Sequence, residues 1–178
     1  MKTALTQINL ELSSKCDRHT LCSFCGHQDP KINPLPKKFM YLPLLAAIIK
    51  QIPEDCIVQL HRDGDPLAYP ALGMALKCLK PRGVSIVTHG ERLAERASEI
   101  IDQCMTVTVS VIPHDPDRQI QLASLAGFLE ARGPDRPPQV NLKIVGEMPD
   151  EQIADYEGFG LPIIRRALHS KTGNHKYA

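Results

Sequence analysis

The sequence contains no tryptophan, and only four phenylalanines and four tyrosines stand among its 178 residues. A buried core must therefore come mainly from Leu, Ile, Val and Ala, which is typical of helix–sheet layers with parallel strands. No apolar run reaches the ~20 residues that a membrane-spanning helix needs. The first residues also lack the apolar core of a signal peptide. We therefore expect a cytoplasmic protein with no membrane partner.

No charge of one sign dominates either. The 21 Lys and Arg side chains against 20 Asp and Glu give a net charge of +1, which argues against a dominant nucleic-acid-binding surface. At roughly 150 residues per domain, the length predicts a single domain. We expect residues 1–168 to form it and the polar residues 169–178 to be a loose tail.

Apolar and polar residues alternate in a pattern that predicts six strands separated by five helices. The strands are expected at 8–12, 56–60, 84–88, 105–111, 140–145 and 161–168. The helices are expected at 43–52, 70–79, 93–101, 118–132 (capped by Asp117 and stopped by Gly133) and 150–157. Such short β–α units imply a parallel sheet with right-handed crossovers. Periodicity alone leaves two architectures open, a doubly wound sheet and a partial (β/α) barrel.

Polar residues with chemical potential recur directly after the expected strands. Cysteines follow the first strand, residues 63–66 (Asp-Gly-Asp-Pro) the second, and residues 88–90 (Thr-His-Gly) the third, while Ser110 lies near the end of the fourth. In both candidate architectures the carboxyl ends of parallel strands form one mouth, where ligands bind. The sequence therefore predicts a site at this end of the sheet.

Three of the six cysteines, Cys16, Cys22 and Cys25, fall within ten residues. Three thiolates on one loop suit a [4Fe–4S] cluster with one iron left open, or zinc in a closed site completed by His27. A thioredoxin-like pair of Cys22 and Cys25 would leave Cys16 without a role. The other cysteines lie beside or within apolar segments, and we expect them to be buried thiols: Cys56, Cys78 and Cys104.

From Ile8 to about Leu168, the chain resembles the radical S-adenosylmethionine (radical SAM) superfamily. That family carries three cysteines after its first strand, and the second gap and Phe24 before the last cysteine match its pattern. The first gap holds five residues here, where three are usual. The stretch 64–66 (Gly-Asp-Pro) resembles the family's Gly-Glu-Pro, with a shorter acid, and 88–90 (Thr-His-Gly) resembles its Thr-Asn-Gly.

The resemblance implies a partial (β/α)6 TIM-like barrel with a parallel sheet. It also implies a [4Fe–4S] cluster held by Cys16, Cys22 and Cys25, with S-adenosylmethionine on the open iron. The family's cofactor contacts fall here on Phe24, Gly64, Asp65, Thr88, Ser110 and Lys143.

The implied activity is an oxidoreductase-type radical reaction. Reductive cleavage of S-adenosylmethionine yields a 5′-deoxyadenosyl radical, which abstracts hydrogen from a substrate. An electron donor of the flavodoxin or ferredoxin type is implied, and we expect a peptide or protein as substrate. Two alternatives stay open at this point: a zinc-stabilised α/β binding module without catalysis, and a degenerate family member that keeps the cluster but no longer cleaves the cofactor.

Overall fold

The structure, a computed structural model, describes residues 6–16, 18 and 36–167. It contains one sheet of six parallel strands: β1 Gln7–Leu10, β2 Ile57–Leu60, β3 Val84–Thr88, β4 Thr106–Val111, β5 Gln139–Val145 and β6 Ile163–Arg166. Between the strands lie α1 Leu42–Ile49, α2 Leu72–Leu79, α3 Ala97–Ile100, α4 Arg118–Arg132 and α5 Asp150–Glu157, with a short 3-10 helix η1 at Pro66–Ala68.

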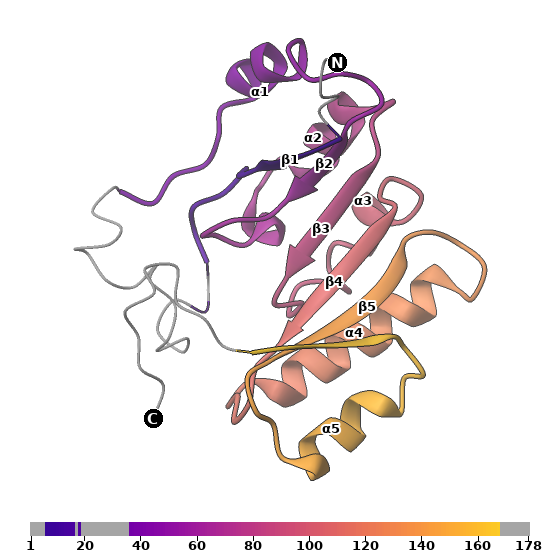
Figure 1. Cartoon of the computed structure of the whole chain (residues 1–178). Helices are drawn as coiled ribbons and strands as arrows, with labels where there is room; N and C mark the ends of the chain where they lie inside the picture. The colour runs from indigo at the N-terminus through magenta and orange to yellow at the C-terminus, as the bar shows by residue number, and fades with distance from the viewer. Residues whose placement is uncertain (1–5, 17, 19–35, 168–178) are drawn as a thin grey trace.

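The strand order decides between the two architectures. The strands pair in the order of the chain, from β1 to β6, without reversal. Because crossovers between parallel strands are right-handed, crossovers that always advance in the same direction place every helix on one face of the sheet. A doubly wound sheet would reverse its order instead. The sheet is therefore an open (β/α)6 half-barrel with β1 and β6 at its edges (Figure 1).

The two faces of the sheet differ in chemistry. Toward the helices, the strands present aliphatic side chains that are almost fully buried: Val58, Leu60, Ile86, Val107, Val109, Leu142 and Ile144. The opposite face, called the inner face below, carries polar side chains that are only half-buried: Gln59, Ser85, Thr106, Thr108, Ser110, Asn141 and Lys143. Neighbouring strands are in register, so these polar positions line up across the sheet. The core thus lies between sheet and helices, and the inner face is left for polar contacts.

The third helix is shorter than expected. We predicted a helix over 93–101, whereas α3 covers Ala97–Ile100 and residues 91–96 form turns. The backbone N–H of Ala94 donates to the Ser124 hydroxyl of α4 at 3.1 Å instead of to an earlier carbonyl. Leu93 and Ile100 are nevertheless fully buried. The apolar pattern therefore located the core contacts correctly, although the backbone before Ala97 mixes hydrogen bonds of three-residue and four-residue spacing and forms turns in place of a regular helix.

Three further expectations need correction. Cys78 is exposed, whereas Cys56 and Cys104 are buried as expected. Asp117 stands at the start of α4, but its side chain makes no capping hydrogen bond. The sixth strand begins only at Ile163, because the preceding proline has no N–H to donate. Leu168 and the expected tail 169–178 lie outside the described residues.

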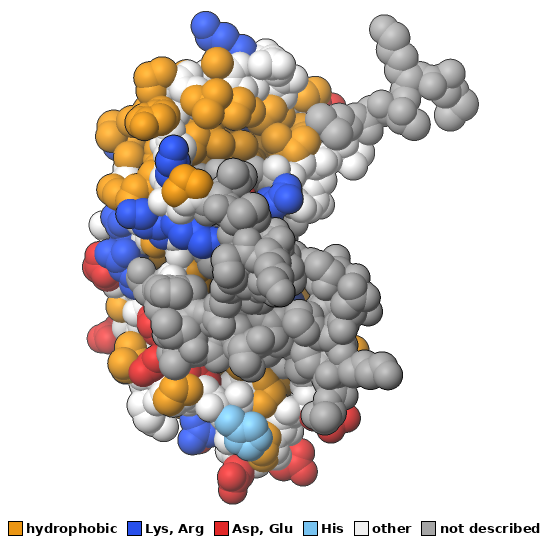
Figure 2. Space-filling model, turned by 90° about the vertical axis from the view of Figure 1, so that its left-hand side faces the viewer, with side chains coloured by type: hydrophobic (Ala, Val, Ile, Leu, Met, Phe, Trp, Pro, Cys, Tyr) orange, Lys and Arg blue, Asp and Glu red, His pale blue; other side chains and the backbone are white. Residues whose placement is uncertain are grey.

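Helix α1 is apolar on nearly all sides, yet only Leu45 of its residues is buried. Tyr41, just before it, is 75% exposed, and Leu44 is 51% exposed. Figure 2 shows hydrophobic side chains at the top of the molecule, the end at which Figure 1 places α1. Within the described ranges, none of the helices has the length and apolarity needed to cross a bilayer.

Candidate functional site

The connection from β1 to α1 carries the three cysteines of the motif, and its two ends are paired. The backbone N–H of Met40 donates to Leu12 O at 2.9 Å, and that of Ser14 donates to Lys38 O at 2.9 Å. Ser13 and Phe39 form an antiparallel bridge between these contacts. We call residues 12–15 and 38–40 the neck. It joins the two ends of segment 16–37, so the position of Cys16 is set by the neck beside it.

The neck rests directly on the loop that follows β2. A Cβ atom added to Gly64 would lie 1.9 Å from the carbonyl oxygen of Ser13 and 2.7 Å from that of Lys15. These are backbone atoms, so no side chain can give way, and only glycine fits. The next residue, Asp65, donates its backbone N–H to Lys15 O at 2.8 Å. The loop after β2 therefore holds the chain one residue before Cys16.

Aromatic contacts secure the neck from its other strand. Phe39 meets Tyr69 edge to face, with ring centroids 6.1 Å apart. The Tyr69 hydroxyl donates to Met40 O at 2.7 Å, and the ammonium group of Lys15 lies 4.5 Å above the centre of the Phe39 ring. Both strands of the neck are thus fixed to the segment between β2 and α2.

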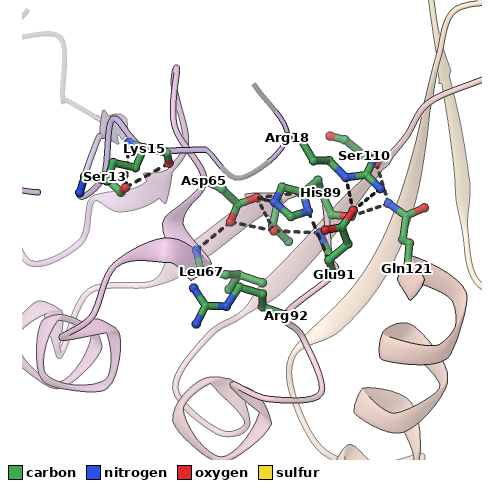
Figure 3. Close-up of polar contacts among 12 residues, drawn as sticks. Ser13, Lys15, Arg18, Asp65, Leu67, His89, Glu91, Arg92, Ser110 and Gln121 are labelled. Carbon is green, nitrogen blue, oxygen red and sulfur yellow. Dashed lines mark hydrogen bonds and ion pairs between the residues drawn. The ribbon is translucent and has the colours of Figure 1, made fainter. Parts of the chain in front are cut away.

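Asp65 connects the loops after β2 and β3 by hydrogen bonds, and it is 4% exposed. Its Oδ1 accepts the backbone N–H of Leu67 at 2.8 Å. Its Oδ2 accepts the Thr88 hydroxyl at 2.7 Å and the backbone N–H of His89 at 2.9 Å. The same Thr88 hydroxyl accepts the N–H of Gly90 at 3.0 Å, where φ is +87°, a conformation that favours glycine. Both carboxylate oxygens are therefore occupied by donors of the chain itself (Figure 3).

Both ring nitrogens of His89 also have partners within the chain. Its Nε2 lies 3.4 Å from Asp65 Oδ2. Its Nδ1 accepts the backbone N–H of Glu91 at 3.4 Å, which assigns the remaining proton to Nε2, facing the carboxylate. A ring held in this way positions the turn after β3.

A buried amide ties the ends of β3 and β4 to the helices. Nε2 of Gln121, on α4, donates to the carbonyl oxygen of His89 and, at 3.1 Å, to that of Ser110. Its Oε1 accepts the Tyr156 hydroxyl of α5 at 2.6 Å. Burial, followed by the negative charge of Asp115, raises the pKa of Tyr156 to about 12. The hydroxyl therefore stays protonated and available as this donor.

Arg18, two residues after Cys16, connects the cysteine segment to the loops that follow β3 and β4. It is 2% exposed, and its guanidinium forms ion pairs with Glu91, after β3, and with Asp115, after β4. Figure 3 shows the guanidinium directed at Glu91, beside the Gln121 amide. Burial opposes the charge, but Asp115 and Glu91 outweigh burial and raise the pKa of Arg18 above its ordinary value.

Ser110 and Lys143 lie side by side on the inner face, as register partners of β4 and β5. Burial, and then the positive charge of Arg166, lowers the pKa of Lys143. A hydroxyl next to a partly desolvated ammonium is a donor set suited to hydroxyl and carboxylate groups of a ligand. The Asp65 carboxylate, in contrast, already accepts a hydrogen bond from within the chain on each of its two oxygens.

The expected site residues divide into three groups. The structure brings Gly64, Asp65 and Thr88 together at the ends of β2 and β3, and places Ser110 and Lys143 on the inner face. Of the cysteine segment, Cys16 is described and half-buried beside the neck, whereas Cys22, Phe24, Cys25 and His27 lie outside the described residues. Among the residues the structure does describe, no three His, Cys, Asp or Glu side chains are grouped to hold a metal ion.

Three residues of this arrangement were not predicted from the sequence: Arg18, Glu91 and Gln121. Gln121 could have been found, because it shares the buried stripe of α4 with Ser124, Leu125 and Phe128, and a polar residue in such a stripe needs a buried partner. No local pattern marks Arg18, since its partners lie far along the chain.

Comparison with known proteins gives little at the level of sequence. No protein-family model matches the chain, and no curated protein matches it. Among solved structures, the fold is similar to that of BtrN in complex with AdoMet and 2-DOIA, with a TM-score of 0.47 and 14% identity. The likeness covers 94% of this chain, which spans 58% of the BtrN chain. At this degree of likeness, function has to be argued from the site itself.

Proposed function

We propose that this chain is a radical SAM domain that binds a [4Fe–4S] cluster and S-adenosylmethionine at the carboxyl ends of its strands. The observation that carries the proposal is the seat of the neck on Gly64 and Asp65. It holds Cys16 at the strand ends of a half-barrel, where such folds bind ligands. The spacing of Cys16, Cys22 and Cys25 supplies three thiolates, which leaves one iron of a cubane open.

The residues of the chain would divide the work as follows. The three cysteines hold the cluster, and Ser110 and Lys143 on the inner face bind and orient the cofactor. Asp65 acts through the loop that it organises with Thr88, since both its oxygens are occupied. Held by these cysteines, a reduced [4Fe–4S] cluster would provide the electron needed for reductive cleavage of a carbon–sulfur bond of S-adenosylmethionine. The protein's own contribution is placement and exclusion of water.

The saturation of Asp65 also favours a second candidate, a domain that binds the cluster without cleaving the cofactor. In the family pattern the acid is a glutamate, one methylene longer. Here the shorter acid accepts bonds from Leu67, Thr88 and His89 within the chain. If cleavage requires the acid to receive the amino group of the cofactor, the wild type will cleave slowly and Asp65→Glu will cleave faster.

The deciding experiment is anaerobic reconstitution with iron and sulfide, followed by dithionite reduction and chromatography for 5′-deoxyadenosine. We expect a brown protein with about four irons per chain and formation of 5′-deoxyadenosine. Cys16→Ser, Cys22→Ser and Cys25→Ser should each lose both. Cys78→Ser is the matched control, because Cys78 is exposed and lies outside the motif.

The outcomes separate the candidates. A brown protein that yields no 5′-deoxyadenosine as wild type or as Asp65→Glu supports the non-cleaving domain. A colourless protein that binds one zinc through the same cysteines refutes both iron candidates and returns the function to a structural zinc module.

We also propose an electron donor of the flavodoxin or ferredoxin type and a peptide or protein substrate. The edges of the half-barrel at β1 and β6 support a bulky substrate, because these two strands do not pair with each other and no other strand of the described residues joins them. Reduced flavodoxin should replace dithionite in the cleavage assay. Deuterium transfer from a labelled extract into 5′-deoxyadenosine would then identify the substrate fraction, and transfer only from small molecules would refute the peptide or protein assignment.

A further inference from the structure

Two residues close to Cys16, Lys15 before it and Arg18 after it, are fixed to other parts of the fold, and we call these two attachments anchors. On one side, the carbonyl of Lys15 accepts the backbone N–H of Asp65 at 2.8 Å. On the other side, Arg18 is buried between Glu91 and Asp115. The first anchor belongs to the loop after β2, and the second joins the loops after β3 and β4. Cys16 therefore lies on a short span fixed at both ends to different strands.

The ion pairs of Arg18 are largely buried, unlike those of a protein surface. The side chains of Arg18 and Asp115 are each 2% exposed, and that of Glu91 is 17% exposed. Asp115 is itself oriented, because its Oδ1 accepts the backbone N–H of Asp117 at 3.0 Å. Exposed ion pairs contribute little to stability, whereas removing one partner of a buried pair leaves an uncompensated charge.

We propose that Arg18 is a positioning residue, which fixes the first cysteine of the motif by tying its segment to Glu91 and Asp115 at the ends of β3 and β4. The five residues between Cys16 and Cys22 provide the place for this arginine. Its planar guanidinium can serve two carboxylates at once, which a lysine ammonium does less well. The inference rests on the proposed function only for what Cys16 binds, because the ion pairs belong to the chain alone.

The test begins with the protein before reconstitution, by amide hydrogen exchange at residues 12–18. We expect Arg18→Gln to increase exchange there about tenfold or more relative to the helix α4 amides, since local opening is measured separately from global unfolding. Arg18→Lys should recover part of the protection. Arg118→Gln is the matched control, because Arg118 pairs at 3.1 Å with the exposed Asp155, which takes no part in the Arg18 ion pairs.

A double variant sharpens the test. In Arg18→Gln, the carboxylate of Asp115 stays buried without its partner. Adding Asp115→Asn removes that charge, so the double variant should lose less protection than the two single variants together. If Arg18→Gln exchanges like Arg118→Gln, or if it accelerates exchange equally in α4, the positioning role is refuted.

The reconstituted protein gives a second readout. At a temperature where each variant is folded, we expect Arg18→Gln to lose iron to a chelator about tenfold faster than Arg118→Gln, and to show an altered electron paramagnetic resonance spectrum of the reduced cluster. An unchanged spectrum with unchanged iron loss would refute the link from Arg18 to Cys16. If the wild type takes up no cluster while the exchange result holds, the proposed function fails and the anchor stands.

Discussion

Replacing Gly64 with alanine tests the seat of the neck most directly. The added methyl carbon would lie 1.9 Å from Ser13 O and 2.7 Å from Lys15 O. Relief requires the neck to move by roughly 1 Å, and overpacking of this kind costs about 1–3 kcal/mol. The same movement stretches the 2.8 Å hydrogen bond from Asp65 N–H to Lys15 O, which adds about 0.5–1.5 kcal/mol.

The expected total is a loss of about 2–4 kcal/mol in the free energy of unfolding. For a chain of this size, that corresponds to a fall in Tm of about 5–15 °C, measured by circular dichroism or calorimetry. Gly158→Ala is the control, because its nearest atoms would lie at an ordinary 3.8 Å and its φ is −56°. If the two variants melt within about 1 °C of each other, the close approach of loop and neck is refuted.

Three further predictions concern single groups. Thr88→Val removes the hydroxyl that donates to Asp65 and should lower the free energy of unfolding by about 1–3 kcal/mol in urea titrations; an unchanged midpoint would contradict this role. Lys143→Met should raise Tm slightly, because burial disfavours the ammonium, and should weaken S-adenosylmethionine binding in calorimetry; a lower Tm with unchanged binding would contradict its assignment. Burial raises the pKa of Cys104 from 9.0 and of Tyr156 from 10.0, each to about 12. The fold favours their protonated forms, so the stability they contribute is present below pH 9 and lost as the pH rises toward 12. The double variant Cys104→Ala/Tyr156→Phe should flatten this alkaline loss, and an equally steep loss would refute the assignment.

Much of the fold could be predicted from the sequence, because each buried strand and helix carries its own apolar period. The strand at 84–88 and the helix at 150–157 were predicted with the bounds that the structure shows. The helix predicted over 93–101 was not, because residues 91–96 form successive turns whose backbone hydrogen bonds mix three-residue and four-residue spacing. The choice of a half-barrel came from the family resemblance and is confirmed by the strand order.

The site could be predicted only where position along a strand determines it. Asp65 and Thr88 follow neighbouring strands, so the rule that ligands meet at strand ends brought them together in advance. The partnership of Arg18 with Glu91 spans 73 residues of chain, and no spacing rule contains it. The contacts of Gly64 with the neck were likewise invisible, because they depend on how two loops approach each other in space. The roles of Cys22, Cys25 and Phe24 stay predictions.

The pairing of the two ends of the neck affects how easily the spacing of the cysteine motif can change in length. Residues 12–15 and 38–40 are joined, and the entropic cost of closing a loop at such a joint grows only with the logarithm of the loop length. Two residues more or fewer in that loop alter the closure free energy by only about 0.1 kcal/mol. A gap of five in place of three therefore adds little to the cost of loop closure, so this cost alone does not prevent the spacing of the cysteines from changing.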